Sequence, residues 1–366
     1  MFPGIAVARV LARRHPGACI VFAGTRRGIE ERALAREGLA FEPIRSSGLV
    51  GKSLPAIAKT VALGPAMFAD AARLLRRVRP ELVVGLGGYS SGPLVLLAAL
   101  TGRPTMLLEQ NAVPGLTNRL LAPVVSAAAV SFDATVACFG PKAFVSGNPV
   151  REGFFAESRA GRGATAGRPR LLVLGGSQGA HTLNAAMVEA APALAAALPG
   201  GIDITHQTGE RDRDAVREGY RQAGVAARVQ AFFEDLAGEM HAADLAVCRA
   251  GATTLAEISA AGLPAIIVPL PHAAGDHQRR NAAALAAAAA AEVVEQDAAA
   301  SVLAGRVAEL AGDTERRRSM SAAARRLARP EAAWRVVDRA EQLMGRPSRP
   351  AHDAPPGAGG PGRDSP

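Results

Sequence analysis

Aromatic residues are scarce in this sequence: they make up 4% of its 366 residues, with two Tyr and one Trp. Proteins that bind single-stranded nucleic acid usually stack the bases on exposed aromatic rings. The sequence also lacks zinc-finger spacing and the aromatic signature of RNA-recognition modules. We therefore expect no nucleic-acid partner.

Cysteine is scarce too. Cys19, Cys138 and Cys248 are odd in number and show no CxxC spacing, which argues against a disulfide scaffold. Each lies in a short apolar run, so we expect three buried free thiols in a protein of a reducing compartment.

Long apolar runs are missing as well. Residues 82–100 are interrupted by the Gly- and Pro-containing stretch 87–93. Residues 282–291 are too short, because a spanning helix needs roughly 18 to 20 apolar residues. Residues 1–5 lack the charged region and apolar stretch of a signal peptide. We expect a protein without a transmembrane helix that is made and kept inside the cell.

The positive charge is unevenly distributed along the chain. Residues 1–150 hold 17 basic and 8 acidic residues, which accounts for the whole net charge of +9, whereas residues 151–366 hold 25 of each. A basic half of a chain favours an anionic partner. Because aromatic stacking platforms are lacking, we expect that partner to be an anionic membrane surface.

Segment 51–80 has the composition of a membrane-surface helix. Its apolar residues recur at helical spacing beside basic ones, as in a helix that rests on anionic lipid. The alternative is an ordinary crossover helix whose apolar stripe packs on a sheet. The candidate membrane patch comprises Ile57, Val61, Phe68, Arg73, Arg76 and Arg77.

Short apolar runs alternate with Ala-, Leu- and Arg-rich segments along the chain, a pattern typical of parallel sheets with helices on both faces. We expect two doubly wound α/β domains, over residues 1–156 and 170–345, joined by a Gly- and Arg-rich linker over 157–169. Residues 346–366 contain six Pro and four Gly and are expected to form a disordered tail. The expected strands are 19–24, 41–46, 82–88, 105–110, 128–131 and 135–139, then 170–175, 202–207, 228–232, 245–249, 265–269 and 291–295.

The first domain opens in an unusual way for this fold class. A doubly wound domain normally begins with a central strand, whereas residues 5–15 already have the apolar pattern of a crossover helix. One strand and the loop after it are missing from the expected order.

Three Gly-rich turns follow expected strands, at residues 87–92, 175–179 and 249–254. Glycine lets the backbone approach a ligand, and the N–H groups at the start of the next helix attract phosphate oxygens. Each turn alone is equally well explained as a tight strand-to-helix connection. Three such turns at the carboxyl ends of strands predict a ligand cleft between two facing domains.

Polar residues near these turns are candidates for nucleotide binding. Thr253, Thr254 and Glu257 fall in the first turns of one expected helix, where hydroxyls suit a diphosphate and a carboxylate suits ribose hydroxyls. The alternative is a Thr-x-x-Glu capping box. Gln278 is suited to a sugar or to a solvated turn, and Arg151 can bind a diphosphate through two N–H groups.

Metal and nucleophile chemistry find little support. The acidic pair Asp212 and Asp214 lies in a charged stretch typical of an exposed helix start, so no metal site is expected. The pattern GxSxG occurs only within the Gly-rich turns described above, at residues 88–92 and 175–179, and His206 and His241 lack a Ser or Cys partner in sequence, which favours structural roles.

Seven motifs in order carry a resemblance to a known family: GGYSSGP (87–93), EQNAVPGLTN (109–118), GNPVR (147–151), LGGSQGA (174–180), HQTG (206–209), RAGATTLAE (249–257) and DHQRRNA (276–282). This set resembles the MurG family, the UDP-N-acetylglucosamine:lipid I N-acetylglucosaminyltransferases of bacterial peptidoglycan synthesis. The resemblance runs from Phe2 to about Gly345 without a large gap.

The resemblance implies a GT-B glycosyltransferase, whose two Rossmann-like domains have parallel sheets that face a cleft. It implies inverting transfer of N-acetylglucosamine from UDP-N-acetylglucosamine to the C4 hydroxyl of lipid I, giving lipid II, without metal or cofactor, at the cytoplasmic face of the cell membrane. The implied donor-binding residues are Asn111, Arg151, Ser177, Phe233, Ala252, Thr253, Thr254, Leu255, Ala256, Glu257 and Gln278. The implied acceptor-side residues are Gly87, Gly88, Tyr89, Ser90, Glu109 and Asn118.

Two departures from the family concern the catalytic base, which is left unassigned. The family's first strand and Gly-rich loop, whose His is the usual candidate, would precede Phe2, and Leu108 stands where the family usually has His. A start codon assigned too late explains the first departure. The alternative is a shortened chain that binds UDP-sugar without transferring it. A nicotinamide oxidoreductase is disfavoured, because residues 175–179 lack GxGxxG spacing and no acidic residue ends strand 202–207.

Overall fold

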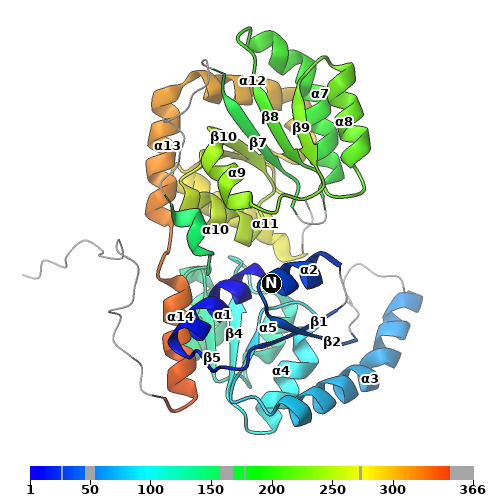
Figure 1. Ribbon diagram of the computed structural model, residues 1–366, viewed down its shortest axis with the longest axis vertical. Helices are drawn as coiled ribbons and strands as arrows, with labels where there is room; N and C mark the ends of the chain where they lie inside the picture. Colours follow the sequence, from blue (N-terminus) through cyan, green and yellow to red (C-terminus); the bar gives the residue numbers. More distant parts are fainter. Residues whose placement is uncertain (26–27, 46–53, 157–167, 177–178, 272–273, 347–366) are drawn as a thin grey trace, which may run out of the picture. The chain divides into compact units, whose positions relative to one another are not determined.

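The structure is a computed structural model that describes residues 1–25, 28–45, 54–156, 168–176, 179–271 and 274–346 (Figure 1). The chain forms two compact units: unit 1 comprises Met1–Pro149 and Arg329–Pro366, and unit 2 comprises Val150–Ala328. This division differs from the expected domains in two places. Residues 150–156, expected in the first domain, belong to unit 2, and residues 329–345, expected in the second domain, belong to unit 1. The expected linker falls mostly outside the described residues, as does all but the first residue of the expected tail.

Unit 2 contains one parallel sheet of six strands in the order β12-β11-β10-β7-β8-β9, with helices on both faces (Figure 1). Its strands are β7 (Arg170–Leu174), β8 (Asp203–Gln207), β9 (Ala227–Gln230), β10 (Leu245–Cys248), β11 (Ala265–Ile267) and β12 (Ala291–Val293). Its helices are α7 (His181–Ala197), α8 (Arg213–Gln222), α9 (Leu236–Ala242), α10 (Ala252–Ala261), α11 (His277–Ala287), α12 (Ala299–Gly312) and α13 (Thr314–Leu327).

Both faces of this sheet are buried. Leu171 and Val173 of β7 lie in a core cluster with residues of α7 and α12. Leu172 and Leu174 lie in a second cluster with residues of α10 and α11. Because successive strand residues point to opposite faces, a strand that is apolar on both faces is typical of a parallel sheet between two helix layers. The carboxyl edge of the sheet is therefore the place where its loops are open to a ligand.

Unit 1 contains two parallel sheets, with the orders β1-β2 and β3-β4-β5-β6. Its strands are β1 (Val21–Gly24), β2 (Ala40–Pro43), β3 (Val83–Gly85), β4 (Thr105–Glu109), β5 (Ala127–Val130) and β6 (Ala143–Val145). Its helices are α1 (Phe2–Arg14), α2 (Gly28–Arg36), α3 (Leu54–Val78), α4 (Ser91–Leu100), α5 (Leu116–Leu121), α6 (Val136–Phe139) and α14 (Ala332–Leu343). On one face, Met106 and Leu108 pack with α1 and α14; on the other, Leu107 packs with α3 and α4.

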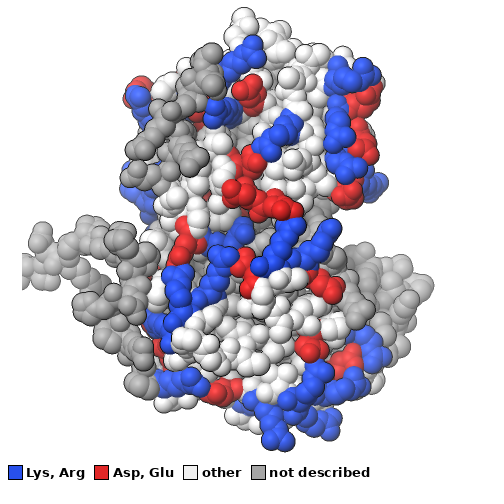
Figure 2. All heavy atoms as spheres, in the orientation of Figure 1, with Lys and Arg blue, Asp and Glu red and all other residues white. Residues whose placement is uncertain are grey.

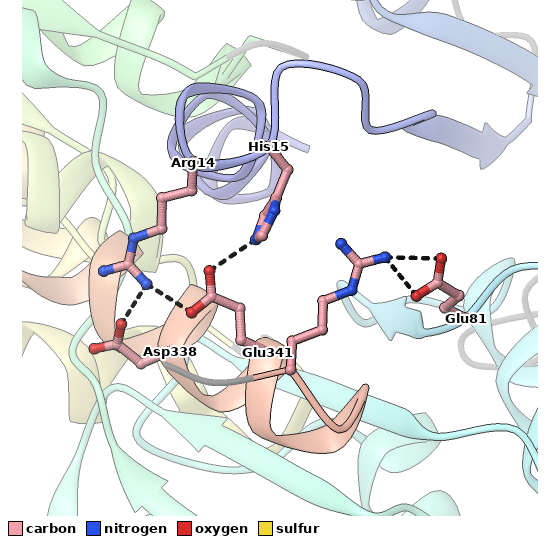
Figure 3. Close-up of polar contacts among 6 residues, drawn as sticks. Arg14, His15, Glu81, Asp338 and Glu341 are labelled. Atoms are coloured by element: carbon pink, nitrogen blue, oxygen red, sulfur yellow. Dashed lines mark hydrogen bonds and ion pairs between the residues drawn. The ribbon is translucent and has the colours of Figure 1, made fainter. Parts of the chain in front are cut away.

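Helix α14 is joined to α1 by polar contacts around the buried pair of Arg14 and Glu341 (Figure 3). Arg14 Nη1 lies 2.6 Å from Asp338 Oδ1 and 3.0 Å from Glu341 Oε2, and His15 Nε2 lies 2.9 Å from Glu341 Oε1. The side chains of Arg14 and Glu341 are 5% and 1% exposed. The Arg14 guanidinium also stacks over Trp334 at 5.0 Å from the ring centroid. Breaking one partner of a buried charged pair is costly, so this group commits α14 to unit 1.

One expected strand is wrong. Thr135 ends a 3₁₀ turn that begins at Asp133, residues 136–139 form the short helix α6, and the strand lies later, at β6. Thr135 and Phe139 are buried while Ala137 and Cys138 are exposed, which is the four-residue spacing of a helix. The Thr135 hydroxyl donates to the Phe132 carbonyl and closes the first turn. The remaining expected strands occur, with bounds that differ by a few residues.

The cysteine prediction is wrong for two of the three residues. Cys248 is fully buried in β10, where burial raises the pKa of its thiol to about 12. Cys19 and Cys138 are exposed. Cys19 comes two residues before β1, and Cys138 lies on the outer side of α6. An apolar run alone therefore did not determine which side chains face the core.

Candidate functional site

The turns after four neighbouring strands of unit 2 lie side by side. The Arg249 N–H donates to the Leu174 carbonyl, which joins the turns after β10 and β7. The Gly175 N–H donates to the Gln207 carbonyl, and the Val268 N–H donates to the Cys248 carbonyl. The ends of β8, β7, β10 and β11 thus share one edge, as expected for a ligand site of a doubly wound sheet.

Helix α10 begins directly after this edge, at Ala252. Gly251 is its N-terminal cap and provides no side-chain hydrogen bond, so the Thr-x-x-Glu capping box is not formed. Thr253 and Thr254 are half-buried at the first turn, whereas Leu255 packs into the core. Ala256 is also half-buried. The start of a helix of this length carries partial positive charge and suits an anion.

Glu257 is a buried carboxyl group one turn into α10. It is 5% exposed, and burial raises its pKa to about 7, while the nearby Arg151 acts in the opposite direction. Arg151 Nη2 lies 4.0 Å from Glu257 Oε1, and its guanidinium stacks over Phe154 at 5.1 Å from the ring centroid. A buried carboxyl group with a cation beside it is poised to accept hydrogen bonds from hydroxyl groups.

Two side chains, one in the turn before α10 and one in α11, hold this region together. Arg249, 8% exposed, donates from Nη1 to the Val268 carbonyl at 3.0 Å and from Nη2 to Gln296 Oε1 at 2.8 Å. Asn281 of α11 donates to the Ala250 carbonyl at 3.2 Å. These residues fix the turn before α10, and burial lowers the pKa of Arg249 from its ordinary value.

Gln278 lies at the start of α11 and is half-buried. Its Oε1 accepts a hydrogen bond from the Leu270 N–H at 3.0 Å. This bond to the loop after β11 fixes the orientation of the Gln278 side-chain amide.

The turn after β7 requires glycine at two positions. A Cβ on Gly179, whose φ is +78°, would lie 2.5 Å from the Thr208 carbonyl oxygen. A Cβ on Gly175 would lie 3.0 Å from the Ala180 nitrogen. The backbone is therefore packed closely against the loop after β8. Ser177, which the resemblance places in the donor site, lies outside the described residues.

A chain of buried polar side chains supports this turn. Tyr220 donates to His206 Nδ1 at 3.0 Å, and His206 Nε2 donates to Asn184 Oδ1 at 3.1 Å. Asn184 Nδ2 donates to the Thr208 carbonyl at 3.0 Å and to Asp212 Oδ2 at 2.9 Å. Burial lowers the pKa of His206 to about 3, which keeps the ring neutral and suited to one donated and one accepted bond.

Phe233 follows β9 and is buried at 3% exposure. Its N–H donates to Gln207 Oε1 at 3.2 Å, and the Arg228 guanidinium lies 4.8 Å from the centre of its ring. Because this N–H is already bonded to Gln207, a nucleobase near Phe233 would contact other main-chain groups.

In unit 1, Glu109 organises the loop that carries Asn111 and Asn118. Its Oε1 accepts from the backbone N–H and the side chain of Asn111, at 3.0 and 3.2 Å. Its Oε2 accepts from the Gly115 N–H and from Asn118 Nδ2, both at 2.9 Å. Glu109 and Asn118 are each 2% exposed, so they support the loop from its buried side.

The Gly-rich turn after β3 adjoins this loop. A Cβ on Gly87 would lie 3.7 Å from Asn118 Nδ2, and Gly87 and Gly88 have φ of +83° and +78°. Tyr89 and Ser90 are half-buried, and Ser90 caps α4 without a side-chain bond. Within the described residues, Asn118 Oδ1 is buried without a hydrogen-bond partner. The structure thus brings the predicted acceptor-side residues of unit 1 together.

Helix α3 combines both interpretations of its sequence. Leu74 and Leu75 are buried, as in a crossover helix, whereas Phe68 is 41% exposed. The side chains of Arg73 and Arg77 are 69% and 60% exposed, and Arg76 is also exposed. Figure 2 shows Lys and Arg gathered over α3. The side chains of Ile57 and Val61 lie outside the described part of the chain.

A second exposed apolar stripe, which the sequence reasoning missed, runs along α5 and the residues after it. Leu116, Leu120 and Val124 are 48%, 71% and 39% exposed. Leu116 and Leu120 lie one turn apart on the same side of α5, and Val124 follows in the turn after the helix. Arg119 is exposed, and Lys142 Nζ donates to the Ala122 and Pro123 carbonyls at the end of α5.

Comparisons with known proteins agree with this geometry. Residues 1–130 match the glycosyltransferase family 28 N-terminal domain, and residues 170–336 match the family 28 C-terminal domain. Over 348 residues the chain is 45% identical to the UDP-N-acetylglucosamine--N-acetylmuramyl-(pentapeptide) pyrophosphoryl-undecaprenol N-acetylglucosamine transferase of Anaeromyxobacter dehalogenans (strain 2CP-C), covering 94% of this chain and 90% of that relative.

The chain belongs to the MurG family.

Solved structures extend the comparison to the fold. The crystal structure of Acinetobacter baumannii MurG matches with a TM-score of 0.68 and 29% identity, covering 93% of this chain and 95% of that one. The calicheamicin glycosyltransferase CalG4 matches with a TM-score of 0.62 at 18% identity, covering 95% and 96%, which is a likeness of fold alone. The GT-B class expected from the resemblance to the MurG family is confirmed.

Two further findings concern membrane-spanning helices and metal ligands among the described residues. None of the helices described is both long and apolar enough to cross a membrane. In the same residues, no group of three or more His, Cys, Asp or Glu side chains could hold a metal ion. Asp212, which was considered as a metal ligand in sequence, instead accepts from Asn184 and lies 3.2 Å from His181 Nδ1.

Proposed function

We propose that this chain transfers N-acetylglucosamine from UDP-N-acetylglucosamine to the C4 hydroxyl of lipid I, which yields lipid II for peptidoglycan synthesis. The observation that carries the proposal is the 45% identity, over 94% of this chain, to a relative that is named as the N-acetylglucosamine transferase of this reaction. The edge geometry of unit 2 supports it, because a closely packed Gly turn, a helix start and a buried carboxyl group suit a sugar nucleotide.

In the proposed donor site, the diphosphate binds at the start of α10. The partial positive charge of the helix start and the guanidinium of Arg151 both favour an anion there. Residues Ala252 to Ala256 contribute through the backbone of the first turn and through the hydroxyls of Thr253 and Thr254. Ser177 and Asn111 stay predictions for this site.

Ribose and sugar recognition are proposed for two residues with different environments. Glu257 is buried, so its carboxylate gains more from two ribose hydroxyls than an exposed carboxylate would. Gln278 is oriented by the Leu270 N–H, and we assign its amide nitrogen to the sugar hydroxyls. Phe233 is proposed to meet the uracil through its backbone.

The proposed reaction is an inverting displacement. The acceptor C4 hydroxyl loses its proton to a base as it attacks the anomeric carbon, and the bond to UDP breaks with both electrons going to the diphosphate. The helix start and Arg151 stabilise that departing charge without a metal ion. The acceptor is assigned to Gly87, Gly88, Tyr89, Ser90, Glu109 and Asn118 of unit 1. We assign no residue as the base.

We also propose that unit 1 rests on an anionic membrane surface, where lipid I is found. Exposed Phe68 and the stripe Leu116, Leu120 and Val124 supply apolar contact, and the arginines of α3 supply charge. Each cation near an anionic surface contributes about 1 kcal/mol, so three arginines with a few apolar side chains give reversible binding. Ile57 and Val61 stay predictions for this patch.

The test is transfer of radiolabelled N-acetylglucosamine to a lipid I analogue in detergent, with the product identified by mass. We expect a disaccharide product from UDP-N-acetylglucosamine, unchanged in rate when EDTA is added. Calorimetry with the same donor is run alongside. Donor binding without product would support the alternative of a binding protein, and no binding at all would contradict the proposed donor site.

A further inference from the structure

Gln207, the last residue of β8, places a buried polar side chain at the edge that carries the proposed donor site. It is 3% exposed, and its strand lies between β7 and β9 (Figure 1). The pairing of β8 with β9 continues beyond both strands, because the Gly209 N–H donates to the Ala231 carbonyl. Two residues later, the Phe233 N–H donates to Gln207 Oε1 at 3.2 Å. The loop after β9 therefore crosses the end of β8 in contact with Gln207.

One half of the Gln207 side-chain amide is bonded and the other half is open. Because Oε1 accepts from the Phe233 N–H, the orientation of the amide is determined: if it were turned over, Nε2 and this N–H would be two donors facing each other. Within the part of the chain that the structure describes, Nε2 donates to no group, and it is not enclosed. A buried side chain thus presents a fixed N–H donor at the carboxyl edge of the sheet.

The Phe233 carbonyl is a second group left open at this place. Its oxygen accepts no hydrogen bond among the described residues. The residue itself is held firmly, because its ring lies in the core with Leu172 and Leu174 of β7, and the Arg228 guanidinium lies 4.8 Å from the ring centre. Since Phe233 is bonded directly to Gln207, a fixed acceptor lies beside the fixed donor.

A donor beside an acceptor suits one edge of uracil. Along that edge the O4 carbonyl accepts and the neighbouring N3–H donates, whereas cytosine has an amino donor and a bare ring nitrogen at the same positions. Uracil can therefore accept from Gln207 Nε2 and donate to the Phe233 carbonyl at once. Cytosine would place donor against donor and acceptor against acceptor, which leaves four polar groups without partners.

We infer that Gln207 determines the base specificity of the donor site: its amide nitrogen donates to uracil O4, while its amide oxygen holds the Phe233 backbone that accepts from N3–H. This inference rests on the proposed binding of a UDP-sugar, and it adds a side chain that selects uracil over cytosine. The alternative is that Gln207 only supports the loop after β9. A supporting role would change the affinity for every nucleotide alike.

The experiment measures the affinity of the full chain for UDP and for CDP by calorimetry. The two nucleotides share ribose and diphosphate and differ only along the edge of the base. Gln207→Glu keeps an oxygen for the Phe233 N–H and replaces the donor by a second acceptor. Gln230→Glu, at an exposed position of the neighbouring strand β9, is the control with the same change of charge. The thermal midpoint of each form is recorded alongside.

We expect wild type and Gln230→Glu to bind UDP at least about tenfold more tightly than CDP, because a site built to pair with polar groups rejects a ligand that leaves them unpaired. In Gln207→Glu, the carboxylate repels uracil O4 and accepts from the amino group of cytosine. We therefore expect UDP affinity to fall by at least about tenfold in this variant, with CDP affinity unchanged or higher.

Equal affinities of wild type for UDP and CDP, or an unchanged ratio in Gln207→Glu, would overturn the inference while UDP binding itself still supports the proposed donor site. A wild type that binds no UDP would overturn both. If Gln207→Glu has a much lower thermal midpoint, wild type is titrated with 4-thio-UDP, in which sulfur, a weak acceptor, replaces O4. Binding several-fold weaker than that of UDP would then support the inference, and equal binding would overturn it.

Discussion

We predict that Glu257, at its proposed place in the donor site, makes donor affinity depend on pH. Burial raises the pKa of its carboxyl group to about 7, against the influence of Arg151, so near neutral pH the group is about half protonated without donor. In the proposed site, ribose hydroxyls donate to the ionised carboxylate, which favours the charged form and lowers the pKa. A group whose pKa falls on binding releases a proton, so affinity rises with pH through the pKa of the free form.

The size of the effect follows from the two pKa values. If binding restores the ordinary value of about 4.5, the donor must displace a proton from about nine-tenths of the molecules at pH 6, but from about one-tenth at pH 8. Affinity for UDP-N-acetylglucosamine is then about tenfold weaker at pH 6 than at pH 8, a difference of about 1.4 kcal/mol. The sugar-linked diphosphate stays fully ionised over this range and adds no slope of its own.

Calorimetry at pH 6, 7 and 8 measures this slope directly. Titrations in two buffers of different ionisation enthalpy count the released proton. Glu257→Gln keeps the size of the side chain and removes the titration, so we expect weaker binding that no longer varies with pH. A wild type with the same affinity at pH 6 and pH 8, or a Gln variant with the full slope, would refute the assignment of Glu257 to the ribose.

Three other changes test separate parts of the structure. Gly179→Ala places a Cβ 2.5 Å from a backbone carbonyl oxygen at positive φ, so calorimetry should show donor affinity at least about tenfold weaker; Gly200→Ala, with open space around it, should match wild type, and equal affinities for both would contradict the close packing. Asn184→Ala removes the bonds to His206 and Asp212, so denaturant unfolding should show a loss of about 2 to 4 kcal/mol, and a loss below about 0.5 kcal/mol would mean that the network is not needed. Arg76→Glu with Arg77→Glu should reduce sedimentation with anionic vesicles, less so as salt rises and not at all with neutral vesicles; wild-type binding would leave α3 as a crossover helix only.

Much of the fold could be predicted because its central strands, such as β4, β5, β7 and β10, are buried on both faces. A run such as residues 171–174 is apolar at every position, and such runs bounded by glycine are hard to mistake. The strand predicted at residues 135–139 was wrong. Thr, Val and Phe in this segment favour a strand, but the Thr135 side-chain bond and the following Gly140 favour a turn. The return of α14 to unit 1 depends on pairing with Arg14, more than 300 residues away in sequence, and local patterns carry no such signal.

The candidate site was predictable only in part, for a similar reason. The turn that holds Thr253, Thr254 and Glu257 is local, so its residues could be named, yet the raised pKa of Glu257 arises from tertiary burial. The supporting chain from Tyr220 to Asp212 joins a strand to two helices and has no sequence spacing of its own. The sequence does not indicate the apolar stripe on α5, because a helix of six residues is too short to show the hydrophobic periodicity of a helix.

The last helix of the chain completes the first unit. Residues 150–328 are synthesised before α14, so unit 2 has all of its sequence at hand while unit 1 still lacks a helix of its core. Proteins of several domains commonly fold in the order in which they emerge. Here the unit that is begun first is finished last, so a ribosome stalled late in the message would carry a folded unit 2 beside an N-terminal half that still exposes the apolar surface meant for Trp334 and Val337.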